Sequence, residues 1–315
     1  MTDLSVIGIR FALYADLMLL TGLAAFPLYA LGSDERRNSQ FALSLTRPLQ
    51  WFCALGLLFS ALGILILTAN MYGIGAFSVD MAMLLTMIRD TDVGAAWLCR
   101  MIALLVATAA ASRLAASPAI ASAILALTGA IALATLAWSG HAGATEGLAG
   151  AIHRINDALH MIAAAIWLGA LAAFLLMLRT FRGAEQAKLA ARCLDQFARV
   201  GTICVLIIVA TGLINADLIV GIANAGRSLA SPYGQLLLIK LLLFGSMLLL
   251  AGANRWRLTP ALTASVVNGD SRAAIGRIRR SIAAEAAVGI AILVLVAWFG
   301  TLEPQDLFAL PRGNS

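Results

Sequence analysis

Two stretches of this chain, residues 48–79 and 114–145, contain no aspartate, glutamate, lysine or arginine. A helix needs roughly 20 mostly apolar residues to cross the hydrocarbon core of a bilayer, and both stretches exceed that length. The whole chain is 61% hydrophobic and only 12% charged, which is far from the composition of a soluble domain. The sequence therefore predicts an all-α integral membrane protein.

Hydropathy along the chain predicts eight transmembrane helices joined by short loops. The predicted spans are residues 6–30, 49–70, 94–112, 118–139, 155–178, 199–221, 233–253 and 281–302. No soluble domain is indicated, so residues 1–315 are predicted to form a single membrane domain. The longest segments outside the spans are residues 71–93 and 254–280, and each is expected to contain a short helix. Asp3 and the length of the first span argue against a signal peptide.

The positive charge of the chain is distributed unevenly between the predicted loops. Fifteen of the 22 Lys and Arg residues fall in alternate loops on one side, and five fall on the other. Cytoplasmic loops of membrane proteins carry such an excess, so both termini are predicted to be periplasmic. The net charge of +6 is therefore a topology signal, and it gives no reason to expect nucleic-acid binding.

Weak internal similarity suggests that the chain consists of two parallel four-helix repeats. The matching segments are Gly94 to Arg100 with Gly234 to Lys240, and Gly22 to Phe26 with Ala170 to Phe174. In the first pair, the glycine precedes the cation by six residues in both copies. Because each half has four spans, the second half enters the membrane in the same direction as the first. The predicted repeats are residues 1–139 and 155–302.

The three histidines of the chain all flank the predicted outer loop between the fourth and fifth spans. They are His141, His153 and His160. Histidine is the commonest metal ligand, so this grouping predicts a metal site at the periplasmic face. Asp157 and Trp167 share a helix face with the last two histidines. Asp157 is expected either to orient an imidazole or simply to favour the helix N-terminus by its charge.

Soft ligands near this face come from sulfur-containing residues. Met81 and Met83 lie in the outer segment, and their thioethers would suit Cu(I). The same segment has the pattern of an amphipathic helix at the membrane surface, in which methionine only packs. Cys99 is either a thiolate ligand or a buried, inert cysteine.

Four charged residues are predicted within or near the outer half of the membrane: Asp16, Arg100, Asp217 and Lys240. Charges at this depth are costly and tend to pair or to line a cavity. The pairs expected from the sequence are Asp16 with Arg100, and Asp217 with Lys240. For Lys240 the alternative is that its side chain extends to the membrane surface.

An ordered series of short motifs resembles the copper resistance protein D (CopD) family of bacterial inner-membrane proteins. The series is Arg10-Phe11, Gly22 and Phe26; Thr91, Gly94, Trp97 and Arg100; His141-Ala142; His160, Trp167, Leu168 and Gly169; Phe197, Thr211, Gly212, Asn215 and Ala216; Tyr233, Gly234 and Lys240; Asn254-Arg255, Leu258 and Pro260. The resemblance implies an eight-helix protein of copper homeostasis that works with a periplasmic copper-binding protein. It implies no particular set of ligands.

The sequence thus predicts a non-enzymatic protein that accepts copper, as Cu(I), at the periplasmic face and moves it across or into the inner membrane. His141, His153 and His160 would form the entry site with Met81 and Met83, and the metal would pass between the two halves. One alternative is a b-type haem protein with His141 and His160 as axial ligands and Arg100 and Lys240 at the propionates. Another is a scaffold for other copper proteins that does not itself transport.

Overall fold

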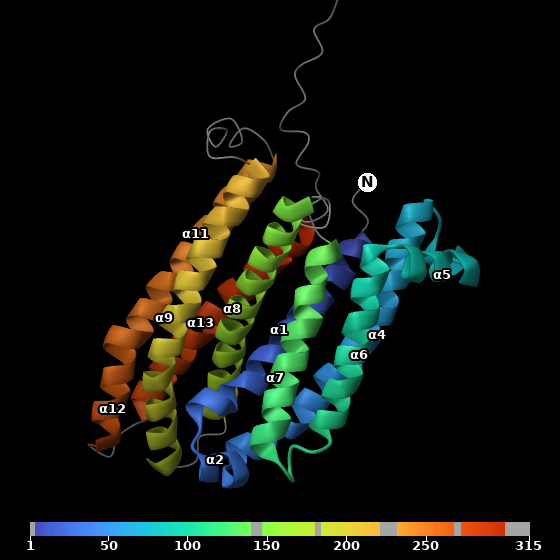
Figure 1. The fold of residues 1–315 in the computed structure, drawn as a ribbon. Coiled ribbons are helices and arrows are strands. Elements are labelled where there is room, and N and C mark those ends of the chain that lie inside the picture. Colours follow the sequence, from blue (N-terminus) through green and yellow to red (C-terminus); the bar gives the residue numbers. More distant parts are fainter. Residues whose placement is uncertain (1–3, 140–146, 180–183, 221–231, 268–271, 300–315) are drawn as a thin grey trace, which may run out of the picture.

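The computed structural model describes residues 4–139, 147–179, 184–220, 232–267 and 272–299, which form a bundle of helices (Figure 1). Eight of these helices are long and apolar enough to cross a membrane, which confirms the predicted number. They are α1 (Leu4–Ala30), α4 (Thr46–Tyr72), α6 (Asp92–Ala111), α7 (Pro118–Ala134), α8 (Gly147–Arg179), α9 (Ala184–Val220), α11 (Pro232–Ala253) and α13 (Arg272–Phe299).

Short helices occupy the segments between the long ones. They are α2 (Ser33–Asn38), α3 (Gln40–Ser44), the 3-10 helices η1 (Ala76–Ser78) and η2 (Thr135–Ser139), α5 (Met81–Asp90), the π-helix η5 (Asn254–Leu258) and α12 (Thr259–Val267). The short helices expected in the two longest segments are therefore present. In the second segment, η5 and α12 continue α11 directly.

Several long helices extend well beyond the predicted spans, and α9 shows why. Hydropathy detects its apolar part from residue 199, whereas the helix begins at Ala184. The additional residues are polar but are good helix formers. They also pack against the end of α1, because Arg192 forms an ion pair with Glu35 of α2 and the Cys193 thiol donates to the Ala30 carbonyl at 3.3 Å.

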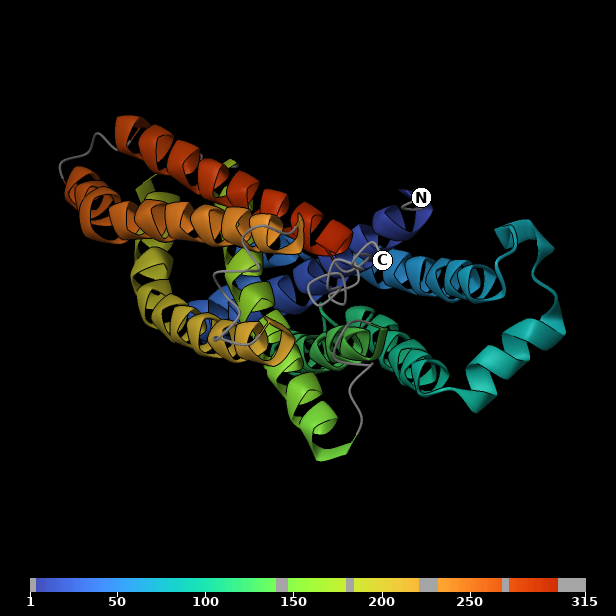
Figure 2. The ribbon, with the colours of Figure 1, turned by 90° about the horizontal axis from the view of Figure 1, so that it is seen from above.

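The long helices form two groups that meet at α1 and α8 (Figure 2). In the first group α1 packs against α4 and α7, and α6 packs against the same two helices. In the second group α8 packs against α9 and α13, and α13 packs against α11. Helix α1 begins and α13 ends at one end of the bundle, whereas α2 and α12 lie at the opposite end (Figure 1).

The two groups touch through backbone atoms where α1 crosses α8. A Cβ atom on Gly22 would overlap the carbonyl oxygen of Ala165, and a Cβ atom on Gly169 would overlap the backbone of Gly22. Small residues allow this kind of approach between membrane helices. At this level no space remains between α1 and α8, so the expected passage of metal between the two halves is closed in this structure.

Aromatic rings fill the junction between the groups on the side of the glycine contact that faces the C-terminal ends of α1 and α8. Phe26 of α1 and Phe174 of α8 meet edge to face, with ring centroids 5.2 Å apart. Phe197 of α9 contacts Phe174 at 5.6 Å and Trp167 at 6.2 Å. Phe26 and Phe174 occupy matching positions in the two predicted repeats, so these matching residues meet at the interface between the groups.

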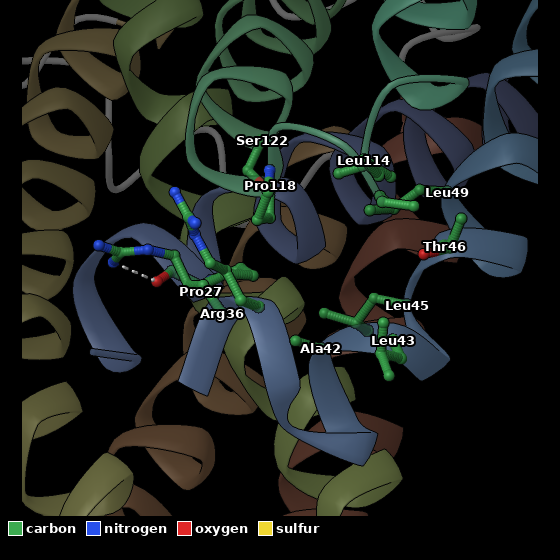
Figure 3. A pocket seen from close by; sticks show the side chains of 12 residues that line it. Pro27, Arg36, Ala42, Leu43, Leu45, Thr46, Leu49, Leu114, Pro118 and Ser122 are labelled. Carbon is green, nitrogen blue, oxygen red and sulfur yellow. Dashed lines mark hydrogen bonds between the residues drawn. The ribbon is translucent and has the colours of Figure 1, made fainter. Parts of the chain in front are cut away.

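A pocket opens at the end of the bundle that contains α2, between α2, α3, α4 and the start of α7 (Figure 3). Arg36 extends along it and donates hydrogen bonds to the carbonyls of Pro27 at 3.2 Å and Leu31 at 2.6 Å. A cation there stabilises the C-terminal end of α1, whose last carbonyls have no partner within the helix. Histidine, cysteine, methionine and acidic residues are absent from the lining of this pocket, so it offers no copper ligands.

Candidate functional site

Polar side chains from four helices gather in the half of the bundle where α1 and α8 begin. We call this group the α8 polar cluster. Its members are His153, Asn156, Asp157 and His160 of α8, Thr211 and Asn215 of α9, Lys240 of α11, and Arg10 and Tyr14 of α1. The α8 residues recur every three or four positions, which places them on one side of the helix as predicted. His153 and Asn156 are buried, and His160 is half-buried.

A threonine on the neighbouring helix orients His160. The ring Nδ1 of His160 lies 2.9 Å from the Thr211 hydroxyl oxygen. That hydroxyl donates its own hydrogen to the Ile207 carbonyl at 2.5 Å, so it accepts from the protonated Nδ1. The lone pair of the neutral ring is then on Nε2, which is the form that binds a metal ion. Thr211, rather than Asp157, therefore orients this histidine.

Two asparagines connect α8 to α9 beside this histidine. Asn156 Nδ2 donates to the Thr211 carbonyl at 2.9 Å and to Asn215 Oδ1 at 2.7 Å. Asn215 Nδ2 in turn approaches Asp157 Oδ1 at 3.4 Å. Thr211 and Asn215 belong to the motif series quoted above but had no predicted role, and Asn156 was missed. Its position on the face of His153 and His160 is the signal that could have identified it.

Lys240 lies near Asp157 of α8, so the predicted pair of Lys240 with Asp217 is wrong. The Asp157 carboxylate is within electrostatic range of Lys240, His153 and Arg10. Lys240 is half-buried, and among the described residues it forms no ion pair with Asp217. The sequence could not predict this partner, because it depends on packing that brings the polar face of α8 near Lys240 of α11.

The other predicted pair, Asp16 with Arg100, is also not formed. Asp16 is 4% exposed, and neither of its carboxylate oxygens has a hydrogen-bond partner. Arg100 of α6 is 7% exposed and lies within electrostatic range of Tyr14. The carboxylate of Asp16 instead lies over Gly56 of α4, whose missing side chain leaves room for it. These residues belong to the first group of helices and are separate from the hydrogen bonds around His160.

Trp167 takes part in a hydrogen-bonded group that sequence reasoning missed. Its indole Nε1 donates to Glu285 Oε1 of α13 at 2.7 Å. Asn254 Nδ2, at the start of η5, donates to Glu285 Oε2 at 2.8 Å. Glu285 is 2% exposed and stands in an otherwise apolar part of α13. An acidic residue alone in a membrane span is itself a signal of function.

The sulfur-containing candidates do not join the α8 polar cluster. Met81 and Met83 lie on α5, which packs against α4 and α6 at the edge of the bundle (Figures 1 and 2). Met81 is 67% exposed, as in the amphipathic-helix interpretation. Cys99 is on an exposed face of α6, so the interpretation of a buried, inert cysteine is wrong, whereas its role as a thiolate ligand stays a prediction. Among the described residues, Met81 and Met83 therefore lie on a different part of the bundle from His153 and His160.

His141 lies outside the described residues. The described chain reaches η2, where the ring of Trp138 is held 5.6 Å from the Arg154 guanidinium of α8. His153 and His160 are seven residues apart on α8, about 10 Å along the helix axis, so one ion cannot bridge them directly. Within the described ranges no three His, Cys, Asp or Glu side chains are arranged to hold a metal ion.

The fold and this cluster define a multi-pass helical membrane protein with a histidine-containing polar site at one end. Residues 1–151 match the family described as "Copper resistance protein D-like, N-terminal domain", and residues 191–299 match "Copper resistance protein D". The chain is 40% identical to "Copper resistance protein D" of Pseudomonas syringae pv. tomato, over 97% of this chain and 98% of that protein. The chain belongs to the copper resistance protein D family.

A second relative extends the comparison. The chain is 30% identical to "Inner membrane protein YebZ" of Escherichia coli (strain K12), over 95% of this chain and 98% of that protein. No solved structure matches the chain significantly. The family membership confirms the resemblance seen in the sequence and supports a copper-related function.

Proposed function

We propose that this protein accepts copper, as Cu(I), at the periplasmic face of a bacterial inner membrane and moves it across or into that membrane. The observation that carries the proposal is the His160–Thr211 contact, which leaves the lone pair of the neutral ring on Nε2, the atom that would bind the metal. Copper is proposed as the metal because the chain belongs to the copper resistance protein D family. The proposed site is His160 with His141, and the protein acts without enzymatic chemistry, together with a periplasmic copper-binding protein.

We place the path of the metal in the second group of helices. The backbone contact between Gly22 and Gly169 closes the junction of the two groups. The polar face of α8, by contrast, continues from His153 through His160 to Trp167, at a spacing that keeps all three on one side. His160 and Trp167 are bonded to α9 and α13, which are both members of the second group.

The first test is the visible spectrum and metal content of the purified full-length protein. We expect copper near stoichiometry and no Soret band. A Soret band would show bound haem and would favour the alternative of a b-type haem protein with His141 and His160 as axial ligands. Protein that binds neither copper nor haem would favour a scaffold that carries no metal.

The proposed topology has both termini in the periplasm and two parallel repeats. The contact between the matching residues Phe26 and Phe174 supports the repeats, since residues near the axis between parallel repeats meet at the same depth. A reporter enzyme fused after Ser315 is expected to be active only if it folds in the periplasm. The matched fusion at Asn38, between α1 and α4, should give the opposite result. Reversed signals would contradict every assignment of sides.

A further inference from the structure

Glu285 is buried within the second group of helices and is held by two neutral donors. It lies on α13, four residues after the start of the predicted span 281–302. Its two carboxylate oxygens accept from Trp167 Nε1 at 2.7 Å and from Asn254 Nδ2 at 2.8 Å. With 2% of its surface exposed, Glu285 is separated from water by three elements, α8, α13 and η5.

No cation of the described chain neutralises this carboxylate. The titratable groups on the elements packed against α13 are Arg10, Tyr14, Asp16 and Tyr29 of α1, His153, Arg154, Asp157, His160 and Arg179 of α8, Lys240 of α11, and Arg255 and Arg257 of η5. None of them forms an ion pair or a hydrogen bond with Glu285. Arg255 is directed to α9, where it donates to Thr202 Oγ1 at 2.6 Å. An uncompensated charge in such a place is costly, and a proton removes it.

Asn254 is suited to hold Glu285 in both protonation states. Asn254 is 8% exposed, and its Oδ1 is buried without a hydrogen-bond partner. With the carboxylate ionised, Nδ2 of the amide donates to Oε2, as observed. After a proton binds to Oε2, a half-turn of the amide would bring Oδ1 to the same place, where it accepts from the new O–H group. One hydrogen bond is kept in either state, while the other end of the amide stays unpaired.

We propose that Glu285 is an intramembrane proton-binding site, held by Trp167 and Asn254, and that protons are the coupling ion of copper movement. One proton from water converts the Glu285 carboxylate to a carboxylic acid, and the reverse step returns the proton to water. The coupling part of the proposal rests on the proposed function, whereas proton binding does not. Asn254 begins a π-helical segment, a local irregularity that is frequent at functional sites. Trp167 lies on the α8 face of His160, which links the site to the α8 polar cluster.

Infrared difference spectra of the full-length protein, recorded between acid and alkaline buffer, test proton binding without copper. We expect a C=O band of a buried carboxylic acid that disappears in Glu285→Gln. The band should be unchanged in Glu185→Gln, which makes the same change at a side chain that is 86% exposed. If Glu285→Gln does not fold, Asn254→Ala serves instead and should shift the band, because the acid loses its partner. A band that neither variant changes would overturn the proposal.

Proteoliposomes that contain a pH-sensitive dye test the coupling. Addition of Cu(I) should move protons with the wild-type protein, and Glu285→Gln should abolish this movement while it still binds copper at the α8 polar cluster. Copper movement that leaves the dye unchanged would overturn the coupling and leave the proposed function intact. Wild-type protein that neither binds nor moves copper would overturn the proposed function, and the infrared result would still decide whether Glu285 binds a proton.

Discussion

Replacing Gly169 by valine should prevent the two groups of helices from packing together. A side chain at this position overlaps the backbone of Gly22, and backbone atoms cannot move aside by changing rotamer. Inserting a few methyl groups into a well-packed core costs about 1–3 kcal/mol, and a backbone collision should cost more than that range. We expect loss of the monodisperse peak in size-exclusion chromatography, or a large fall in the thermal unfolding temperature in detergent.

Gly245→Val of α11 is the matched control, because no atom lies within 4 Å of a Cβ placed there. It makes the same substitution within a membrane-spanning helix and should leave folding nearly unchanged. If the two variants unfold alike, valine in a span is itself harmful and the α1–α8 contact is not the cause. If Gly169→Val is as stable as the wild type, the close crossing of α1 and α8 is wrong.

His160→Ala should abolish copper binding by the purified protein without loss of the fold. The substitution removes the one ring in the described chain whose tautomer is set for metal binding by a neighbouring hydroxyl. Metal analysis after dialysis measures binding, and thermal unfolding measures the fold. Unchanged copper content in a folded His160→Ala protein would return this histidine to a structural role.

Thr211→Val tests the orientation of the ring separately from the ring itself. Valine keeps the shape of threonine but cannot accept from Nδ1, so His160 loses its fixed tautomer. Loss of such a partner typically lowers metal affinity by about 10–100-fold, and we expect a change of that size in Cu(I) competition assays. Thr108→Val on α6, a threonine of the first group bonded to the Leu104 carbonyl, is the matched control and should bind copper as the wild type does. Equal affinities of the two variants would contradict the role of Thr211.

Hydropathy predicted the number of spans because a membrane helix must satisfy its own backbone hydrogen bonds and be apolar over its whole length. The helix α5 was likewise predicted from its amphipathic pattern. The limits of α9 were not, since its polar first half is held by contacts with the end of α1. Such contacts leave no trace in local hydropathy.

The sequence predicted only the part of the candidate site that lies on the single helix α8. The spacing of His153, Asp157 and His160 placed them on one face of α8, because helical periodicity is a local property. The partners on other helices, Thr211 for His160 and Glu285 for Trp167, could not be predicted in this way. The pairing of Asp16 with Arg100 failed for the same reason.

The sequence alone determined that this is an eight-helix membrane protein of the copper resistance protein D family with histidines grouped at one end. Those properties depend on composition, periodicity and motif order, which are read along the chain. Only the tertiary structure decided that Gly22 and Gly169 close the junction of the groups, that Thr211 orients His160, and that Glu285 is bonded to Trp167 and Asn254. Each of these depends on which helices lie side by side, and many arrangements of eight apolar helices are compatible with the same hydropathy.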